Sequence, residues 1–536
     1  MTRSDNMSKK SLSILFGAGA EISYGLPSGG KFALEIFRRD NGRAKDEFKK
    51  RVNKVNKKSR YAVRWLPRDF SNKRVQTFRK DHYTSLIQSS LEHKKYKVIE
   101  YINQFDAFAE RIVNELEKRG LDILQSFKNI TGESVGSTFY SQVLELNESL
   151  KMGNTLFDSK YFSALLQVLE IKEKEENDES FENIRLFTRT ILEFLVGACG
   201  KEFIQNLNDT IFKKKPSGID LFDEIGGVFD LRYSKIGFDG LKFLLEKPLK
   251  EPSSNSNESA IEYFAFRIVE DLVSEVFDYQ ALIDKNFRYL YCPKDNWGKF
   301  CSMAIFLQKV RDYMEQQLEE IYKKSLSQFE GFYHDLGSVK NYFDIKCIGT
   351  TNYTDLIEKI IASEDIIYLN GSLDEFYDPY LNKVIPSKEV ENSNHILVPF
   401  IFVQSGIKPL TSVDVSRRYV DFYDKLKESD FILVIGFGFN QDDGHINGIL
   451  RKLIIDDGKT IVILDYHPTG DFESSSVIDN YSTKLRLESK YHDHLLVFPI
   501  DDNRCIKCDS DGKNTKNVLW YEYINEKIGT IEKSSS

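Results

Sequence analysis

Ser11–Gly30 reads SLSILFGAGAEISYGLPSGG, and this stretch decides the fold class of the chain. Its apolar run Leu12–Phe16 predicts a short buried β-strand. The strand leads into the glycine turn Gly17-Ala18-Gly19, and a helix-compatible run follows. Such a unit lets a backbone approach phosphate closely, because glycine has no Cβ and a helix N-terminus offers free N–H groups. The stretch therefore predicts a phosphate-binding turn, with an ordinary strand–turn–helix of an α/β protein as the alternative.

The spacing of the glycines is more specific than their number. The dinucleotide fingerprint needs a third glycine where this chain has Ile22, so GxGxxG does not match. Gly17-Ala18-Gly19 is followed, after five residues, by Gly25-Leu26-Pro27, and this pattern resembles the opening motif of the sirtuin (SIR2) superfamily. Glu21 stands where sirtuins usually have Ser, and Ser28-Gly29-Gly30 replaces their Asp-Phe-Arg. This form is similar to the divergent SIR2-like domains of bacterial anti-phage systems.

Alternating strands and helices return late in the chain. The expected strands begin at Phe343 and His395 or span Asp365–Leu369, Phe431–Phe439 and Thr460–Asp465. Helices are expected over Val415–Glu428 and Ile446–Ile455. Strands that are apolar on both faces and alternate with helices favour a parallel sheet covered on both sides. We therefore expect the strand before Gly17 and these later strands to form one α/β Rossmann-like parallel sheet of SIR2 type.

A long helical region separates the two parts of this expected sheet. From about Tyr96 to Phe329 apolar residues recur at helical spacing almost throughout. We expect a discontinuous SIR2-like Rossmann domain from residues 1–40 and 341–470, interrupted by a large, mainly helical insertion over residues 41–340. Residues 471–536 are expected to form a C-terminal extension.

Composition bounds the class of protein. The chain has 536 residues and a net charge of −8, with six mostly scattered cysteines. Such usage favours a soluble, cytoplasmic protein without a disulfide framework and without membrane contact. Basic residues crowd together over residues 38–80. They predict a contact with nucleic acid or an acidic partner, whereas the absence of an evident base-reading arrangement favours a solvated basic face.

Three polar segments follow expected strands. They are Thr350-Thr351-Asn352, Asn370-Gly371-Ser372 and Gly436–Asn440, and each resembles a SIR2 block in the order of the family. Ligands of doubly wound sheets bind outside the carboxyl ends of the strands. The resemblance implies that Asn352 holds the nicotinamide ribose of NAD and a water, and that Asn370 occupies the position of the family's catalytic His.

Further positions are expected to contact NAD. The residues of this expected cofactor site are Gly17, Ala18, Gly19, Glu21, Pro27, Thr351, Asp355, Gly371, Gly436, Gly438, Asn440 and Asp465. Glu21 or Asp355 would stabilise positive charge if either faces the ribose, and Asp465 would accept from an adenosine hydroxyl. The segment from Asn440 to Asn447 resembles the form found in defence proteins.

Two departures bear on catalysis. Asn370 cannot act as a general base, and Thr354 stands where the family has an Asp, with Asp355 one place later. His395 or His445 are possible spatial substitutes, although each is expected to be a surface or turn histidine. No cysteine lies between Gly371 and Phe431, so the zinc ribbon of the deacylases is missing and no metal is expected.

These features support three hypotheses. The first is an NAD hydrolase with catalytic Asn352 and Asn370, which releases nicotinamide and ADP-ribose and acts by NAD depletion in anti-phage defence (abortive infection). The second is a degenerate SIR2-like module that binds NAD or ADP-ribose without turnover. The third is a structural subunit whose basic insert engages nucleic acid or a partner protein such as an ATPase. We expect the helical insertion to serve sensing, partner binding or assembly of a homo-oligomer.

Overall fold

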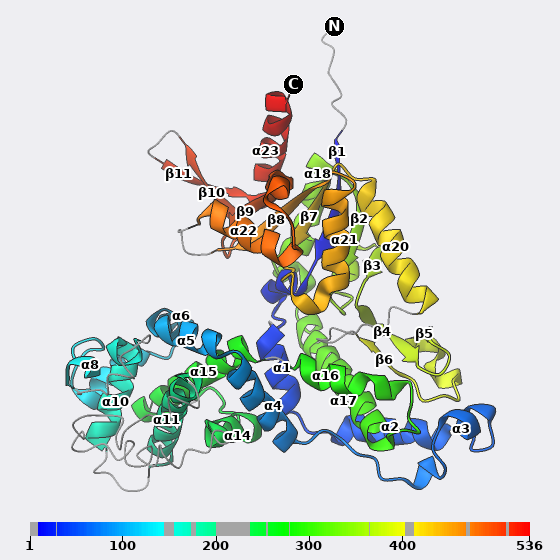
Figure 1. Cartoon of the computed structure of the whole chain (residues 1–536). Helices are drawn as coiled ribbons and strands as arrows, with labels where there is room; N and C mark the ends of the chain where they lie inside the picture. The colour runs from blue at the N-terminus through cyan, green and yellow to red at the C-terminus, as the bar shows by residue number, and fades with distance from the viewer. Residues whose placement is uncertain are drawn as a thin grey trace. The chain divides into compact units, whose positions relative to one another are not determined.

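Figure 1 shows the computed structural model, which describes residues 9–27, 29–143, 155–172, 178–199, 236–252, 256–277, 279–363, 365–401, 412–467, 472–510 and 514–535. The chain forms two compact units. The sheet unit comprises Met1–Ser28, Asn41–Thr77 and Gln280–Ser536, and the helical unit comprises Gly29–Asp40 and Phe78–Tyr279. Residues 41–77 and 280–340, which we assigned to the insertion from sequence, thus lie in the sheet unit. The expected domain boundaries stay a prediction.

The sheet unit contains a six-stranded sheet in which every neighbouring pair is parallel. The strands, in spatial order, are β3 (Ile366–Tyr368), β2 (Phe343–Thr350), β1 (Lys10–Phe16), β7 (Phe431–Ile435), β8 (Thr460–Tyr466) and β9 (Leu495–Ile500). The order reverses between β1 and β7, which is the topological switch point of a doubly wound sheet. The predicted α/β class with a Rossmann-like parallel sheet is confirmed.

The central strand β1 is buried on both faces. Leu12, Ile14 and Phe16 alternate with Ser13 and Leu15, and all five side chains are buried. Successive side chains of a strand point to opposite faces, so Leu15 and Phe16 contact different layers of helices. A parallel strand that is covered on both faces is mostly apolar on both. The apolar run Leu12–Phe16 therefore predicts that β1 is buried.

Helices cover both faces of the sheet. The four that bear on the argument are α18 (Phe332–Tyr342), α20 (Val413–Lys427), α21 (Gly444–Ile455) and α22 (Ser474–Leu485). Leu15 belongs to one buried apolar cluster with Phe422 of α20, Leu450 of α21 and Tyr481 of α22. On the opposite face, the ring of Phe16 meets that of Tyr333 on α18 edge-on, with centroids 5.1 Å apart.

One strand prediction was wrong. The run from His395 was expected in the parallel sheet, but its strand β6 (Val398–Ile401) lies in a separate three-stranded antiparallel sheet with β4 (Gly371–Asp378) and β5 (Lys383–Pro386). A short apolar run does not by itself specify which partner strand it pairs with. The C-terminal extension also contributes a strand, β9, which pairs with β8. The hairpin of β10 (Cys505–Ser510) and β11 (Asn514–Leu519) follows it.

The chain after β1 forms a tight turn before the expected helix. η1 (Ala18–Tyr24) is a 3-10 helix, and Gly25 ends it in a left-handed conformation with φ of +96°. The first α-helix of the chain then follows as α1 (Gly29–Arg38). Glycine adopts a left-handed conformation at the end of a helix more favourably than any other residue. This local requirement explains the glycine at position 25 of the motif.

The remaining helical elements of the sheet unit are α2 (Gly42–Lys54), α3 (Arg60–Trp65), η2 (Phe70–Asn72), α16 (Gln280–Phe287), η6 (Arg288–Leu290), α17 (Trp297–Tyr322), η7 (Leu326–Gln328), α19 (Leu356–Ile361), η8 (Ser387–Asn392), η9 (Gln441–Asp443), η10 (Ser489–His494) and α23 (Trp520–Ser535). The long helix α17 starts where the side chain of Asn296 accepts from the backbone N–H of Lys299 at 3.0 Å. This N-cap satisfies one of the amides that a helix start leaves unpaired.

The helical unit confirms that a large helical insertion interrupts the sheet. Its described helices are α1, α4 (Lys80–His93), α5 (Lys95–Asn103), α6 (Phe105–Glu117), α7 (Ile123–Thr131), α8 (Tyr140–Val143), η3 (Leu156–Asp158), α10 (Lys160–Lys172), α11 (Glu179–Cys199), α14 (Phe238–Glu246) and α15 (Asn257–Val276). α15 contacts α1, α5, α6, α7 and α11, and is the central helix of the unit.

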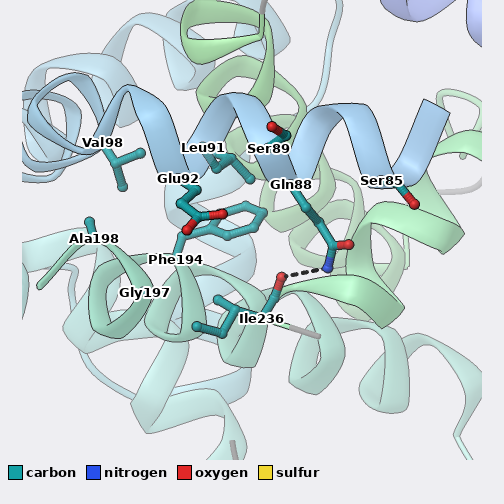
Figure 2. Close-up of a pocket in the computed structure, with 10 residues that line it drawn as sticks. All are labelled: Ser85, Gln88, Ser89, Leu91, Glu92, Val98, Phe194, Gly197, Ala198 and Ile236. Carbon is teal, nitrogen blue, oxygen red and sulfur yellow. Dashed lines mark hydrogen bonds between the residues drawn. The ribbon is translucent and has the colours of Figure 1, made fainter. Parts of the chain in front are cut away.

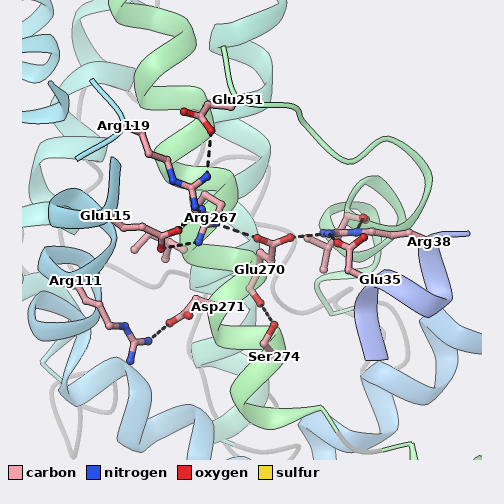
Figure 3. A network of polar contacts seen from close by, with 12 residues as sticks. Glu35, Arg38, Arg111, Glu115, Arg119, Glu251, Arg267, Glu270, Asp271 and Ser274 are labelled. Atoms are coloured by element: carbon pink, nitrogen blue, oxygen red, sulfur yellow. Dashed lines mark hydrogen bonds and ion pairs between the residues drawn. The ribbon is translucent and has the colours of Figure 1, made fainter. Parts of the chain in front are cut away.

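Ion pairs on α15 hold neighbouring helices (Figure 3). The guanidinium of Arg267 lies 3.0 Å from a carboxylate oxygen of Glu115 on α6 and 3.1 Å from one of Glu270. Glu270 in turn pairs with Arg38 of α1 at 2.6 Å. Since Arg38 and Arg267 are nearly buried, these charges stabilise the unit only as long as each retains its partner.

A pocket of about 260 Å³ lies in the helical unit between α4 and α11 (Figure 2). Phe194 and Ile236 give it an apolar wall, and Gln88 donates to the backbone oxygen of Ile236 at 3.2 Å. Across the described residues of both units, no helix has the length and apolar character needed to cross a bilayer.

Candidate functional site

The register of the parallel sheet aligns the carboxyl ends of its strands. Phe16 of β1 pairs with Thr350 of β2 and with Ile435 of β7. Ile435 pairs with Leu464 of β8, and Thr350 pairs with Tyr368 of β3. The residues that follow these pairs are therefore neighbours along one edge of the sheet. The site residues predicted at that edge are Gly17, Thr351, Asn352, Asn370, Gly436 and Asp465.

The glycine turn after β1 packs backbone to backbone against the turn after β7. Gly17 N–H donates to Ile435 O and Gly19 N–H donates to Gly436 O, both at 2.9 Å. A Cβ added to Gly17 would lie 2.5 Å from Gly436 O, and one added to Gly19 would lie 2.7 Å from Gly436 Cα. These two glycines are thus required by the contact between the turns, and their amides are engaged within the protein. Ala18, between them, is exposed at the edge.

Glu21 is buried under the same edge. Its side chain is 3% exposed, and its Oε1 accepts from the hydroxyls of Tyr333 at 3.0 Å and Thr354 at 2.5 Å. Burial raises the pKa of this carboxyl from 4.5 to about 7, although the hydrogen bonds from Thr354, Tyr333 and Asn352 oppose the change. Glu21 therefore changes charge near neutral pH. The sequence does not reveal the hydrogen-bond network that surrounds it.

Asn352 is held in one orientation by this network. Its Nδ2 donates to Gly17 O at 3.1 Å and to the Tyr333 hydroxyl at 3.0 Å, while its backbone N–H donates to Thr350 Oγ1 at 3.0 Å. The residue is 6% exposed. Both amide hydrogens are thus used, which fixes the orientation of the side chain and leaves Oδ1 as its acceptor atom.

Asn370 presents a second acceptor. It is 5% exposed, and among the described residues its buried Oδ1 has no hydrogen-bond partner. An unpaired buried acceptor costs about 1–3 kcal/mol, which a bound donor such as a hydroxyl or a water would recover. The next residue, Gly371, has φ of +84°, and a Cβ there would lie 2.0 Å from Phe400 O. Glycine follows Asn370 because β6 passes this close.

Several predicted residues are engaged by other side chains. Asp355 accepts from the hydroxyl of Tyr322 and pairs with Lys359 at 2.8 Å. It lines a pocket of about 360 Å³ whose wall also includes Ser372. Asp465 accepts from the hydroxyl of Tyr481 at 2.5 Å.

The loop after β7 holds two more of the predicted residues. Asn440 O accepts from Asn447 Nδ2 at 3.0 Å, and Gly438 O lies 3.4 Å from Lys484 Nζ.

Thr351 N–H donates to Phe16 O at 2.9 Å, which connects the turn after β2 to the end of β1. Of the predicted residues that remain, Pro27 follows η1 and is half-buried.

The two histidines considered as substitutes for the family base have structural partners. His395 Nδ1 lies 2.6 Å from Asp378 Oδ2, and its ring stacks on Tyr61 with centroids 4.1 Å apart. The ring of His445 meets Tyr419 edge-on at 5.1 Å. Neither contact involves Asn352.

Tyr333 is the residue that sequence reasoning missed. Its hydroxyl links Glu21 to Asn352, and its ring stacks on Tyr24 with centroids 5.3 Å apart. It lies on α18, in a region read from sequence only as helical, where aromatic residues are common core residues. The Gly331 before it offered a weak signal, since a Cβ there would lie 2.5 Å from the Tyr24 ring.

Metal chemistry has no evident ligand set here. Within the described ranges, no group of three or more His, Cys, Asp or Glu side chains is arranged to hold a metal ion.

Comparisons with known proteins were made at three levels. No protein-family model matches the sequence, and no curated protein matches it. Among solved structures, a Sir2 bound to an inhibitor, 2′-O-acetyl-ADP-ribose and a deacetylated peptide is 15% identical over 35% of this chain and 74% of its own, with a TM-score of 0.21. A structure described as showing the mechanism and regulation of Sir2 enzymes is 15% identical, over 35% of this chain and 81% of its own, with a TM-score of 0.21. A Sir2 bound to a myristoylated histone peptide is 14% identical over 37% of this chain and 82% of its own, with a TM-score of 0.22.

Proposed function

We propose that the carboxyl edge of the sheet binds NAD and hydrolyses its nicotinamide–ribose bond. The observation that carries this proposal is Asn352, whose two amide hydrogens are bound by Gly17 O and the Tyr333 hydroxyl, so that the orientation of its Oδ1 acceptor is fixed. Support comes from the switch point between β1 and β7, where doubly wound sheets bind nucleotides. Further support comes from the four SIR2-like sequence blocks, each of which follows a strand of the parallel sheet.

The reaction needs positioning more than proton transfer. The bond between the nicotinamide nitrogen and C1′ of the ribose breaks, and its electron pair leaves with nicotinamide. Water attacks the resulting oxocarbenium-like carbon and loses one proton to solvent, which gives ADP-ribose. In this scheme Asn352 Oδ1 accepts a hydrogen bond from the attacking water and fixes its direction. Asn370 Oδ1 accepts from a ribose hydroxyl, which supplies the donor that this buried acceptor otherwise lacks.

Glu21 acts through its neighbours in this account. Its carboxylate accepts from the Tyr333 hydroxyl, and that hydroxyl accepts from Asn352 Nδ2. Glu21 therefore orients the amide of Asn352 through Tyr333. When ionised, Glu21 also places a negative charge in a water-poor region near the developing cation, where such a charge stabilises the transition state. Since Asn370 cannot take up a proton, the site is better suited to hydrolysis, which needs little base assistance, than to deacylation.

A second candidate function is binding without turnover. The presence of Asn370 in place of a histidine favours it, because a neutral amide holds a hydroxyl but moves no proton. In that case the site holds NAD or ADP-ribose as a regulatory ligand.

The proposal extends to the biological setting. The resemblance of Asn440–Asn447 to defence proteins suggests an effector that depletes NAD during phage infection. A homo-oligomer and a partner protein such as an ATPase belong to the same proposal. Size-exclusion chromatography with light scattering, alone and with the product of the neighbouring gene, tests both.

Product analysis of purified full-length protein tests the reaction. Incubation with NAD is expected to yield nicotinamide and ADP-ribose in equal amounts, measured by liquid chromatography. The binding module instead predicts saturable binding of ADP-ribose in calorimetry and no nicotinamide release under any condition. Absence of both turnover and binding would refute a nucleotide site at this edge.

A further inference from the structure

A strongly basic surface lies in the sheet unit, within an otherwise acidic chain. Residues 57–74 contain seven cations and one carboxylate, whereas the whole chain has a net charge of −8. All seven cations are exposed. They are Lys57, Lys58, Arg60, Arg64, Arg68, Lys73 and Arg74, and we call them the basic surface. A cluster of exposed cations of this kind is the electrostatic footprint of a site that binds a polyanion.

The basic surface differs from the cations just before it in having no partners. On α2, Lys49 pairs with Asp46 at 3.1 Å, Lys50 with Glu47 at 2.7 Å, and Lys54 with Glu391 at 2.9 Å. Among the described residues, the side chains of the basic surface form no ion pair or hydrogen bond. The phosphates of a bound polyanion would supply partners for these cations.

The backbone that carries these cations is anchored. Tyr61 is buried, stacks on His395, and its hydroxyl accepts from Ile396 N–H at 3.1 Å. Trp65 Nε1 donates to Tyr291 O at 3.1 Å. The cations are thus presented on a fixed platform, which lowers the entropy that binding must remove.

The helix of this segment also orients part of the basic surface. Arg60 and Arg64 are four residues apart on α3 and so lie on one face of it. Arg68 follows the end of α3 at Trp65 by three residues. Four of the seven cations are arginines, whose planar guanidinium groups bind phosphate oxygens in pairs.

We propose that the basic surface binds the phosphate backbone of double-stranded nucleic acid. An acidic protein partner is disfavoured because the cores of protein interfaces are rich in aromatic and apolar side chains and poor in lysine, and in residues 57–74 the exposed large apolar side chain is Val63, at 65%. The same lack of apolar side chains disfavours insertion into an anionic membrane. Single strands are disfavoured because the aromatic rings of this segment pack into the protein instead of offering a stacking surface.

Binding through phosphates alone has a defined signature. Affinity depends steeply on salt and little on base sequence, since each neutralised phosphate releases condensed counterions. This inference does not rest on NAD turnover and holds for a hydrolase or a binding module equally.

Fluorescence anisotropy with the full-length protein tests the proposal. The probes are a labelled DNA duplex, an RNA duplex of the same length and the corresponding single strands, each at low and high salt. We expect duplex binding that weakens at least tenfold between about 50 and 200 mM salt. The triple variant Arg60→Gln, Arg64→Gln, Arg68→Gln is expected to lose at least tenfold in affinity and to reduce the slope of log affinity against log salt by about 2–3.

A matched triple variant provides the control. Lys49→Gln, Lys50→Gln, Lys54→Gln removes the same charge from paired cations of α2 and is expected to change affinity less than threefold. Thermal unfolding of both variants checks that they fold. Equal losses in the two variants, absence of duplex binding at low salt, or tighter binding to polyglutamate, anionic vesicles or single strands would each overturn the proposal. The two duplex probes separate DNA from RNA as the source of the phosphates.

Discussion

Glu21 is the residue whose ionisation the fold changes most clearly in the candidate site. Burial raises its pKa from 4.5 to about 7. A carboxyl whose pKa is higher in the folded state contributes stability below pH 4.5, and this contribution is lost as the pH rises towards 7. The shift corresponds to about 3 kcal/mol, so the folded protein is expected to lose stability over this range on account of Glu21.

Glu21→Gln removes this titration. The quantity to measure is the free energy of unfolding of the variant minus that of wild type, by urea unfolding at each pH. We expect this difference to rise by about 3 kcal/mol between pH 4.5 and pH 8. The exposed Glu389→Gln is the control for the replacement of a glutamate by glutamine outside this network. A pH-independent difference for Glu21→Gln would mean that Glu21 titrates normally.

At the scale of elements, the contact between the turns after β1 and β7 fixes the edge of the sheet. Gly436 has φ of +68°, and a Cβ there would lie 2.2 Å from Ala20 N. Gly458 has a similar φ of +61° but nothing within 4 Å of an added Cβ. Substitutions at Gly458 and Gly436 can therefore distinguish the cost of backbone strain alone from the added cost of the close contact between the two turns.

Alanine at these two glycines is therefore expected to have different effects. Gly458→Ala should lower the free energy of unfolding by about 1 kcal/mol, the cost of a left-handed alanine. Gly436→Ala should lower it by about 3 kcal/mol or more, because the backbone of the other turn must also move. Urea unfolding of the two variants measures this, and equal losses would show that the turns are not in tight contact.

The elements differ in how far the sequence predicts them. β1, β7 and β8 have buried side chains on both faces, and their place in a parallel sheet follows from this burial. β6 is as apolar as they are, yet pairs with β4 because Gly371 turns the chain there at φ of +84°. Strand pairing depends on such local geometry and on distant partners, which a run of apolar letters does not encode.

The residues of the candidate site also differ in how far the sequence predicts them. Residues directly after the strands, such as Asn352 and Asn370, follow from topology, because parallel strands end at one edge. Tyr333 does not, since its role depends on α18 packing against Phe16. The prediction that Gly17 and Gly19 admit phosphate also lacked the information that Gly436 would lie against both.

At the scale of the whole chain, the helical unit has its own source of cohesion. Arg267 is 8% exposed and joins α15 to α6 through Glu115, whereas Arg119 is 47% exposed and also contacts Glu115. Arg267→Ala is expected to lower the free energy of unfolding by about 3 kcal/mol, because it leaves Glu115 and Glu270 without this partner. Arg119→Ala should cost less than about 1 kcal/mol. Urea unfolding compares them, and similar values would mean that the network of Figure 3 contributes no more than surface charges do.

The central claim for the whole molecule is that the oriented amide of Asn352 positions water at a nucleotide bound to the carboxyl edge. Release of nicotinamide from saturating NAD by wild type, Asn352→Ala and Asn370→Ala, with NAD binding measured in parallel, tests it most directly. The account predicts that Asn352→Ala lowers turnover by about a hundredfold or more with little change in NAD affinity, and that Asn370→Ala loses much less. Turnover by Asn352→Ala equal to that of wild type would contradict it.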